Sequence, residues 1–167
     1  MRSTGEVMGI DADIGVAYAK SQMAVQPALP IGGNVFISVR DSDKKAVIPT
    51  VQLLSKLGFV IYATSGTARL LTAEGIAAKP LLKISEGRPH VLDMIKNNEI
   101  AFIINTPSAK QLQRNDEKLI RREALHRNIP IMTTVSGGWA AVNGIDAQKR
   151  RGISVKSLQE HIGISRG

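Results

Sequence analysis

The chain of 167 residues has 43% hydrophobic and 22% charged residues, a composition typical of one globular domain with a buried core. It contains no cysteine, which excludes disulfides, a thiolate nucleophile and cysteine-based metal sites. The net charge of +8 suggests anionic partners, but aromatic residues make up only 4% and none alternates with Lys or Arg as on a base-stacking surface. We find no apolar run of membrane-spanning length and no secretion signal, so we expect a soluble, cytoplasmic protein with neither nucleic-acid nor membrane partners.

The first 30 residues differ from the rest of the chain. They contain three glycines, show no sustained hydrophobic period, and end in the proline-bracketed segment QPALP at 26–30. Apolar residues such as Val7 in a glycine-rich stretch need another surface on which to pack. We therefore predict a lead-in segment over residues 1–30 and one domain over residues 31–167.

From residue 32 onward, short apolar runs alternate with segments of helical spacing. The predicted strands cover residues 35–39, 59–63, 78–83, 100–104 and 129–133. The predicted helices cover residues 47–57, 65–75, 91–98 and 115–127, followed by one helical turn at 139–142 and a last helix at 153–162. In the first of these helices Pro49 falls in the first turn, and Gly58 closes the helix in the left-handed conformation. This alternation predicts an α/β, three-layer, Rossmann-like fold with a five-stranded, mainly parallel sheet and helices on both faces.

Ligands of an open parallel sheet bind where the carboxyl ends of the strands meet helix N-termini. The predicted strand ends are rich in hydroxyls and amides and include two lysines. In chain order they carry Ser38 and Lys44, then Thr64, Ser65, Gly66 and Thr67, then Lys83, then Asn105 and Thr106, and finally Thr133. Hydroxyl and backbone N–H groups donate to phosphate oxygens, while lysines supply countercharge. The sequence therefore predicts an anion site at this edge.

Each component of this site also has a purely structural interpretation. The hydroxyls at 64–67 can serve as helix caps, the two lysines can be solvated surface residues, and the polar residues at 105–106 can end a buried strand. His90 and Asp93 fit either an acid–base pair or a capping pair. Neither a dinucleotide-binding fingerprint nor a P-loop is present, the three histidines lack a metal-binding spacing, and no catalytic triad can be assembled, so we assign no catalytic residue and no metal ligand.

Several motifs, in order along the chain, closely resemble the C-terminal end of the large subunit of bacterial carbamoyl-phosphate synthetases. They are RSTGEVMGID at 2–11, SVRDSDK at 38–44, ATSGTA at 63–68, KISEGRPHVLD at 83–93, IINT at 103–106 and LIRREAL at 119–125. The resemblance implies a methylglyoxal-synthase-like regulatory domain from about residue 30 onward. Residues 1–30 would then be the tail of the preceding ATP-grasp half and a linker.

The resemblance also implies ligands and partners. Uridine monophosphate, an inhibitor, and inosine monophosphate, an activator, would share one pocket. Their phosphate would contact Ser38, Thr64, Ser65, Gly66, Thr67 and Lys83, and their sugar and base would lie toward Lys44, Asn105 and Thr106. Thr133 would lie at the interface that binds ornithine. The domain itself would hold no cofactor, whereas the parent subunit would use ATP with Mg or Mn and would assemble with a glutamine amidotransferase subunit in pyrimidine and arginine biosynthesis.

Three differences from the family sharpen these expectations. Pro107 replaces a threonine common in the family and removes one hydroxyl from the pocket, and Ser65 stands where a histidine is common. Lys83 replaces the tryptophan of relatives that respond to N-acetylglutamate, which favours a phosphate ligand here.

Two alternative functions remain open. One is a methylglyoxal-synthase-like enzyme acting on a phosphate ligand. The two aspartates that serve as bases in methylglyoxal synthase align near Thr106 and Arg88, so this chain lacks aspartates at those positions. The other is a nucleic-acid binder, whose affinity would fall steeply with salt and ignore nucleotide identity.

Overall fold

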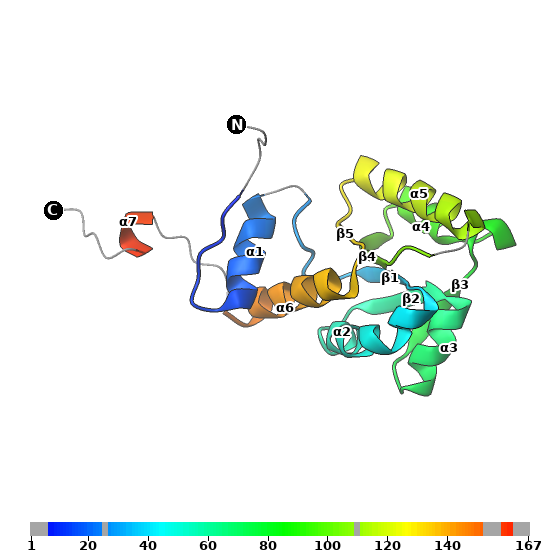
Figure 1. Ribbon diagram of the computed structural model, residues 1–167, viewed down its shortest axis with the longest axis horizontal. Coiled ribbons are helices and arrows are strands. Elements are labelled where there is room, and N and C mark those ends of the chain that lie inside the picture. Colours follow the sequence, from blue (N-terminus) through cyan, green and yellow to red (C-terminus); the bar gives the residue numbers. More distant parts are fainter. Residues whose placement is uncertain (1–6, 25–26, 109–110, 152–157, 162–167) are drawn as a thin grey trace.

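The computed structural model describes residues 7–24, 27–108, 111–151 and 158–161, and its five strands form one parallel sheet (Figure 1). The strands are β1 (Asn34–Ser38), β2 (Val60–Thr64), β3 (Ala78–Leu81), β4 (Ile100–Asn105) and β5 (Ile131–Met132). Their order is β3-β2-β1-β4-β5, and every neighbouring pair is parallel. The chain thus runs from β1 outward to one edge and then continues on the other side of β1, which places a switch point between β1 and β4. The predicted α/β sheet is confirmed.

Helices cover both faces of this sheet (Figure 1). They are α1 (Ile14–Ala24), α2 (Lys44–Lys56), α3 (Ser65–Ala73), α4 (Val91–Lys96), α5 (Gln111–His126), α6 (Val135–Arg151) and α7 (Leu158–His161), with the 3₁₀ turns η1 (Asp41–Asp43) and η2 (Ile84–Glu86). Apolar residues of α2, α3 and α6 form one core with the sheet, and those of α4 and α5 form a second core on the opposite face. None of the helices in the described part of the chain has the length and apolar character needed to cross a bilayer.

The two cores follow from the alternation of side chains along the strands. In β1, Val35 and Ile37 enter the core with α2, α3 and α6, while Phe36 enters the core with α4 and α5. In β4, Ile104 and Ile103 divide between the two cores in the same way. Strands buried on both faces need apolar residues at successive positions, which explains the continuous apolar runs in the sequence.

Two helices differ from the sequence predictions. Helix α1 was not predicted because the apolar residues of its sequence, IGVAYAKSQMA, show no helical period. Helix α6 has 17 residues, where the sequence indicated a single turn at 139–142. Its glycines argued against a helix, yet Gly138 packs against Ile104 and Gly144 against α1, so tertiary packing outweighs their poor helix propensity.

Other boundaries shift by a few residues. Helix α5 begins at Gln111, so Asn115 lies inside the helix and not at its start. Helix α2 begins at Lys44 because η1 leads directly into it, and Pro49 therefore falls in the second turn and not in the first. Gly58 has the predicted positive φ, 85°. Of the predicted helix at 153–162, residues 158–161 are helical, and 153–157 and 162 lie outside the described residues.

Candidate functional site

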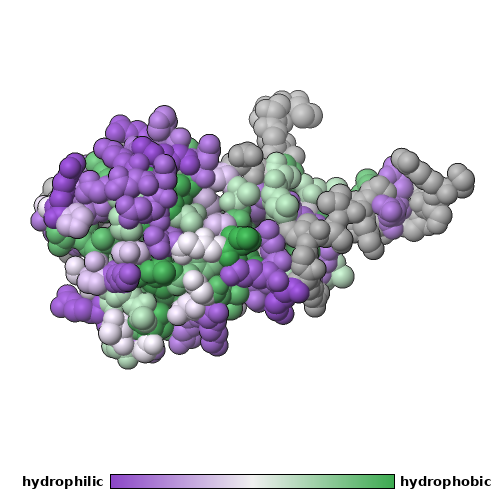
Figure 2. Space-filling view, turned by 180° about the vertical axis from the view of Figure 1, so that it is seen from behind, coloured by the Kyte–Doolittle hydropathy of each residue, from purple (hydrophilic) through white to green (hydrophobic). Residues whose placement is uncertain are grey.

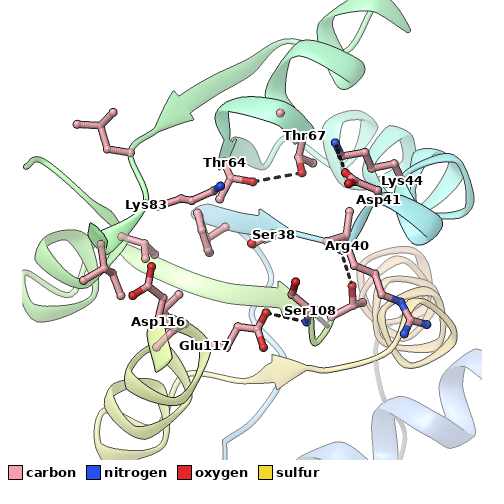
Figure 3. A pocket seen from close by; sticks show the side chains of 18 residues that line it. Ser38, Arg40, Asp41, Lys44, Thr64, Thr67, Lys83, Ser108, Asp116 and Glu117 are labelled. Atoms are coloured by element: carbon pink, nitrogen blue, oxygen red, sulfur yellow. Dashed lines mark hydrogen bonds and ion pairs between the residues drawn. The ribbon is translucent and has the colours of Figure 1, made fainter. Parts of the chain in front are cut away.

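A cavity of about 160 Å³ opens at the carboxyl ends of β1 to β4 (Figure 3). Its polar side chains come from four strand ends and from the first half of α5. Those labelled in the figure are Ser38, Arg40, Asp41, Lys44, Thr64, Thr67, Lys83, Ser108, Asp116 and Glu117. The floor is apolar and is formed by Phe36, Val91 and Ile120 among others. The predicted edge of the sheet therefore carries a hollow with polar walls.

The start of α3 forms one wall of the cavity. Thr64 precedes the helix, and its hydroxyl donates to the Thr67 hydroxyl at 3.3 Å and makes no capping bond to a backbone N–H. Gly66 and Thr67 line the cavity, whereas Ser65 does not. The first N–H groups of a helix have no partner within the helix and carry partial positive charge. This wall therefore presents donors to an anion.

Two lysines reach the cavity from opposite sides (Figure 3). Lys44, in the first turn of α2, has a quarter of its side chain exposed. Its Nζ lies so close to Gly66 that a Cβ atom added at Gly66 would be only 3.3 Å from it. Its ammonium is thus beside the positive end of α3. Lys83 precedes η2, and its Nζ lies 3.7 Å from Glu86 Oε1. Lys44 is likewise paired with Asp41, and two such cations lining one cavity can both attract an additional anion.

The ends of β1 and β4 are joined through Thr106. This residue is 3% exposed, its N–H donates to the Ser38 carbonyl, and its hydroxyl accepts the Arg40 N–H at 3.0 Å. Burial raises the pKa of the Asp43 carboxyl, but hydrogen bonds from Arg40, Thr106 and Ser42 together hold that pKa below its ordinary value. Thr106 therefore lines the cavity while it also fixes the loop that carries Lys44.

Asn105 is, with Thr67, one of the two most deeply buried of the predicted site residues. It pairs in register with Ser38, is 1% exposed, and does not line the cavity as drawn in Figure 3. Both its side-chain Oδ1 and Nδ2 atoms lack a hydrogen-bond partner among the described residues. A buried amide without partners costs about 1–3 kcal/mol, so such a group in a native fold calls for a specific explanation.

Two acidic residues of the cavity, Asp116 and Glu117, were not predicted as site residues from the sequence. They lie in the first half of α5, and the sequence placed them only within the predicted helix at 115–127. Glu117 Oε1 accepts the Ser108 N–H at 2.8 Å, and Asp116 Oδ2 accepts the Ser85 hydroxyl at 3.4 Å. The signal that could have found them is topological, because α5 follows β4 and so begins at the same edge.

The remaining sequence candidates lie elsewhere or serve the fold. Thr133 follows β5 and does not line the cavity. His90 and Asp93 cap α4, with the His90 N–H donating to Asp93 Oδ2 at 3.1 Å, which supports the capping interpretation. Among the described residues, no three His, Asp or Glu side chains gather in a way that could hold a metal ion.

Comparison with known proteins adds a family and several relatives. A family model described as "MGS-like domain" matches residues 46–133. A carbamoyl phosphate synthase large chain from Nostoc sp. is 48% identical over 161 residues, which cover 96% of this chain and 14% of the relative. The C-terminal section of this large chain from Aquifex aeolicus is 48% identical over 165 residues, which cover 96% of this chain and 30% of that section. The chain therefore spans less than a third of each relative.

Among solved structures, a methylglyoxal synthase from Elizabethkingia anophelis has the same fold. The two structures align with a TM-score of 0.57 over 68% of this chain and 79% of the other, at 20% sequence identity. At this level of identity the likeness shows the fold alone.

Proposed function

Because this chain belongs to the MGS-like domain family, we propose that it is the effector-binding, regulatory domain of a carbamoyl-phosphate synthase large chain. The identity of 48% to such large chains over nearly the whole of this sequence supports that context. The proposal implies a cytoplasmic location, ATP-dependent chemistry in the rest of the large chain, and a glutamine amidotransferase partner. Its ligands are phosphate-bearing effectors of the uridine or inosine monophosphate type.

The convergence of Lys44, Lys83 and the start of α3 on one cavity is the observation that carries the proposal. A phosphate placed there accepts hydrogen bonds from the first N–H groups of α3 and from the hydroxyls of Ser38 and Thr64. The two ammonium groups balance its charge.

The opposite wall suits the sugar and base of a nucleotide. Carboxylates accept hydrogen bonds from sugar hydroxyls, and Asp116 and Glu117 line the wall of the cavity that α5 forms (Figure 3). The unpartnered amide of Asn105 offers a donor and an acceptor near the same strand end. A ligand with a phosphate at one end and hydroxyls at the other therefore matches both walls.

Regulation follows from linkage. An effector that binds more tightly to one arrangement of this domain against the synthase core shifts the enzyme toward that arrangement, and substrate binding shifts effector affinity by the same factor. On this proposal Thr133, which lies outside the cavity, belongs to the ornithine-responsive contact with the rest of the large chain.

The test is calorimetric titration of the chain with uridine and inosine monophosphates, with the matching nucleosides as controls. We expect saturable binding that requires the phosphate. Lys83→Ala should weaken that binding about tenfold or more, as expected for the loss of a charge-assisted hydrogen bond. Lys79→Ala is the matched control, because Lys79 lies on β3 over the Tyr62 ring and does not line the cavity. Equal affinity of nucleotide and nucleoside would refute the phosphate site.

A second candidate is catalysis of the methylglyoxal synthase type. It is favoured by the two carboxylates, Asp116 and Glu117, which line the same cavity as the proposed phosphate site and could act as bases toward a carbon next to a carbonyl. Incubation with dihydroxyacetone phosphate distinguishes the two functions, because an enzyme releases methylglyoxal and phosphate whereas a regulatory domain binds without turnover. Asp116→Asn and Glu117→Gln should abolish any turnover that depends on these bases.

A further inference from the structure

Each lysine of the cavity is already paired with a carboxylate three residues away. Lys44 Nζ lies 2.7 Å from Asp41 Oδ1, and Lys83 Nζ lies 3.7 Å from Glu86 Oε1. Both acids belong to 3₁₀ turns, η1 and η2, that stand at the mouth of the cavity. An incoming phosphate must therefore compete with an internal anion for each cation.

The Asp41 pair is the tighter of the two and lies closer to the start of α3. The Asp41 side chain is 90% exposed and lines the cavity, whereas that of Lys44 is 25% exposed (Figure 3). Lys44 Nζ in turn lies beside Gly66, at the first turn of α3. The carboxylate of Asp41 is thus paired with the cation that lies beside the N-terminus of α3.

The neighbouring acidic residues have structural roles. Asp43 accepts hydrogen bonds from Arg40 and Thr106, which fix the loop between β1 and α2. Glu86 accepts the Lys83 N–H at 3.0 Å through Oε2 and so closes η2. Because its side chain is almost fully exposed, Asp41 can leave Lys44 without uncovering a buried group.

We propose that Asp41 is an internal competitor of the phosphate ligand, which sets the affinity of the cavity by holding Lys44 until a phosphate displaces it. The proposal rests on the proposed function, since it assigns a tuning residue to the same site. Phosphate binding exchanges the partner of Lys44 from Asp41 to the ligand.

The experiment compares wild type and Asp41→Asn by calorimetry with uridine monophosphate, inorganic phosphate and uridine. Removing one exposed carboxylate beside the ligand should tighten phosphate binding about threefold to tenfold, the effect of an exposed ion pair plus the repulsion that it exerts on a dianion. Uridine, which has no phosphate, should bind equally to both proteins. Asp146→Asn is the matched control, because Asp146 pairs with Arg150 on α6, outside the cavity.

A double-mutant comparison isolates the pair. In a Lys44→Ala background the gain in affinity from Asp41→Asn should shrink, because the cation for which the two anions compete is gone.

The proposal is overturned if Asp41→Asn binds phosphate ligands no more tightly than wild type, or if Asp146→Asn produces the same gain in affinity. If wild type binds phosphate ligands and Asp41→Asn binds them no more tightly, Asp41 is not a competitor, but the proposed function stands. If neither protein shows phosphate-dependent binding, both the competitor role of Asp41 and the proposed function are refuted. If only Asp41→Asn binds phosphate ligands, the result supports Asp41 as a competitor.

Discussion

The position of Lys44 in the cavity depends on a glycine at position 66, because the lysine ammonium lies where a side chain would be. A Cβ at this position would lie 3.3 Å from Lys44 Nζ, closer than most real contacts, and the flexible end of the lysine would move away. Gly66→Ala should therefore weaken binding of a nucleotide monophosphate several-fold. The fold should keep or slightly gain stability, because Ala has a helix propensity about 1 kcal/mol better than Gly. Titration calorimetry and thermal unfolding measure the two effects.

Ser65→Ala is the control for this substitution. Ser65 precedes Gly66 in the same helical turn but does not line the cavity, so its loss should leave binding nearly unchanged. If Gly66→Ala binds the nucleotide as tightly as wild type, the position of Lys44 beside α3 is not needed for ligand binding. If it loses both binding and stability, the effect is one of folding and not of the cavity.

At the scale of elements, the loop between β1 and α2 is fixed by a carboxylate. Hydrogen bonds from Arg40, Thr106 and Ser42 outweigh burial and hold the pKa of Asp43 below its ordinary value of 3.8. The folded state thus binds this proton less tightly than the unfolded state. Asp43 therefore contributes stability above pH 3.8, and that contribution is lost as the pH falls through the folded-state pKa.

Asp43→Asn should unfold at lower temperature than wild type at pH 7, and the gap should close as the pH is lowered below about 3.8. Thermal unfolding of both proteins across this range measures the gap. Comparing the two proteins at each pH cancels the other groups that titrate there. A gap that stays constant down to the acid limit would mean that the shape of the side chain, and not its charge, holds the loop.

The contact between α1 and α6 depends on small residues. A Cβ at Gly144 would lie 3.3 Å from Tyr18 Cδ1 and 3.4 Å from Leu29 Cδ1. Gly144→Leu should push α1 away and destabilise the fold by about 1–3 kcal/mol, the usual effect of overpacking. Gly144→Ala should be close to neutral, because better helix propensity offsets mild crowding. Urea unfolding midpoints test this order, and equal midpoints for Leu and Ala would show that α1 is not held there.

These helices also show where sequence reasoning succeeds and fails. The strands were located to within three residues at each end because burial on both faces requires apolar runs. The cation and hydroxyl residues of the cavity follow from topology once the strand ends are known. The apolar residues of helix α1 show no helical period, and the glycines of α6 are explained only by their packing against α1 and Ile104. Asp116 and Glu117 face the cavity because of how α5 crosses the sheet, which no local pattern encodes.

At the scale of the whole molecule, part of the positive charge lies outside the cavity. Hydrophilic side chains gather over α5 (Figure 2), where Lys118, Arg121 and Arg122 are exposed. The carboxylates of the same helix, Asp116 and Glu117, line the cavity on its other side. This outer face is suited to solvation, and it lacks the aromatic side chains that stack bases.

The region around α1 also carries exposed apolar side chains. Ile14 is 88% exposed at the start of the helix, Met23 is 50% exposed near its end, and Met8 just before the helix is 70% exposed. Exposed large apolar side chains in one region often mark a contact with another protein surface. On the proposed function, this region would contact the rest of the large chain.

If the proposed function holds, linkage makes the region around α1 part of the regulation, since an effector would act on the synthase core only through contacts that differ between two arrangements. Ile14→Asp should leave the fold and nucleotide binding of this chain intact, because the side chain contributes little to the core. In the full-length large chain it should reduce the change in synthase activity that a saturating effector produces. Leu125→Asp, which places a charge on a 60% exposed side chain of α5, should leave the response unchanged. An undiminished response in Ile14→Asp would mean that the effector signal leaves the domain by another surface.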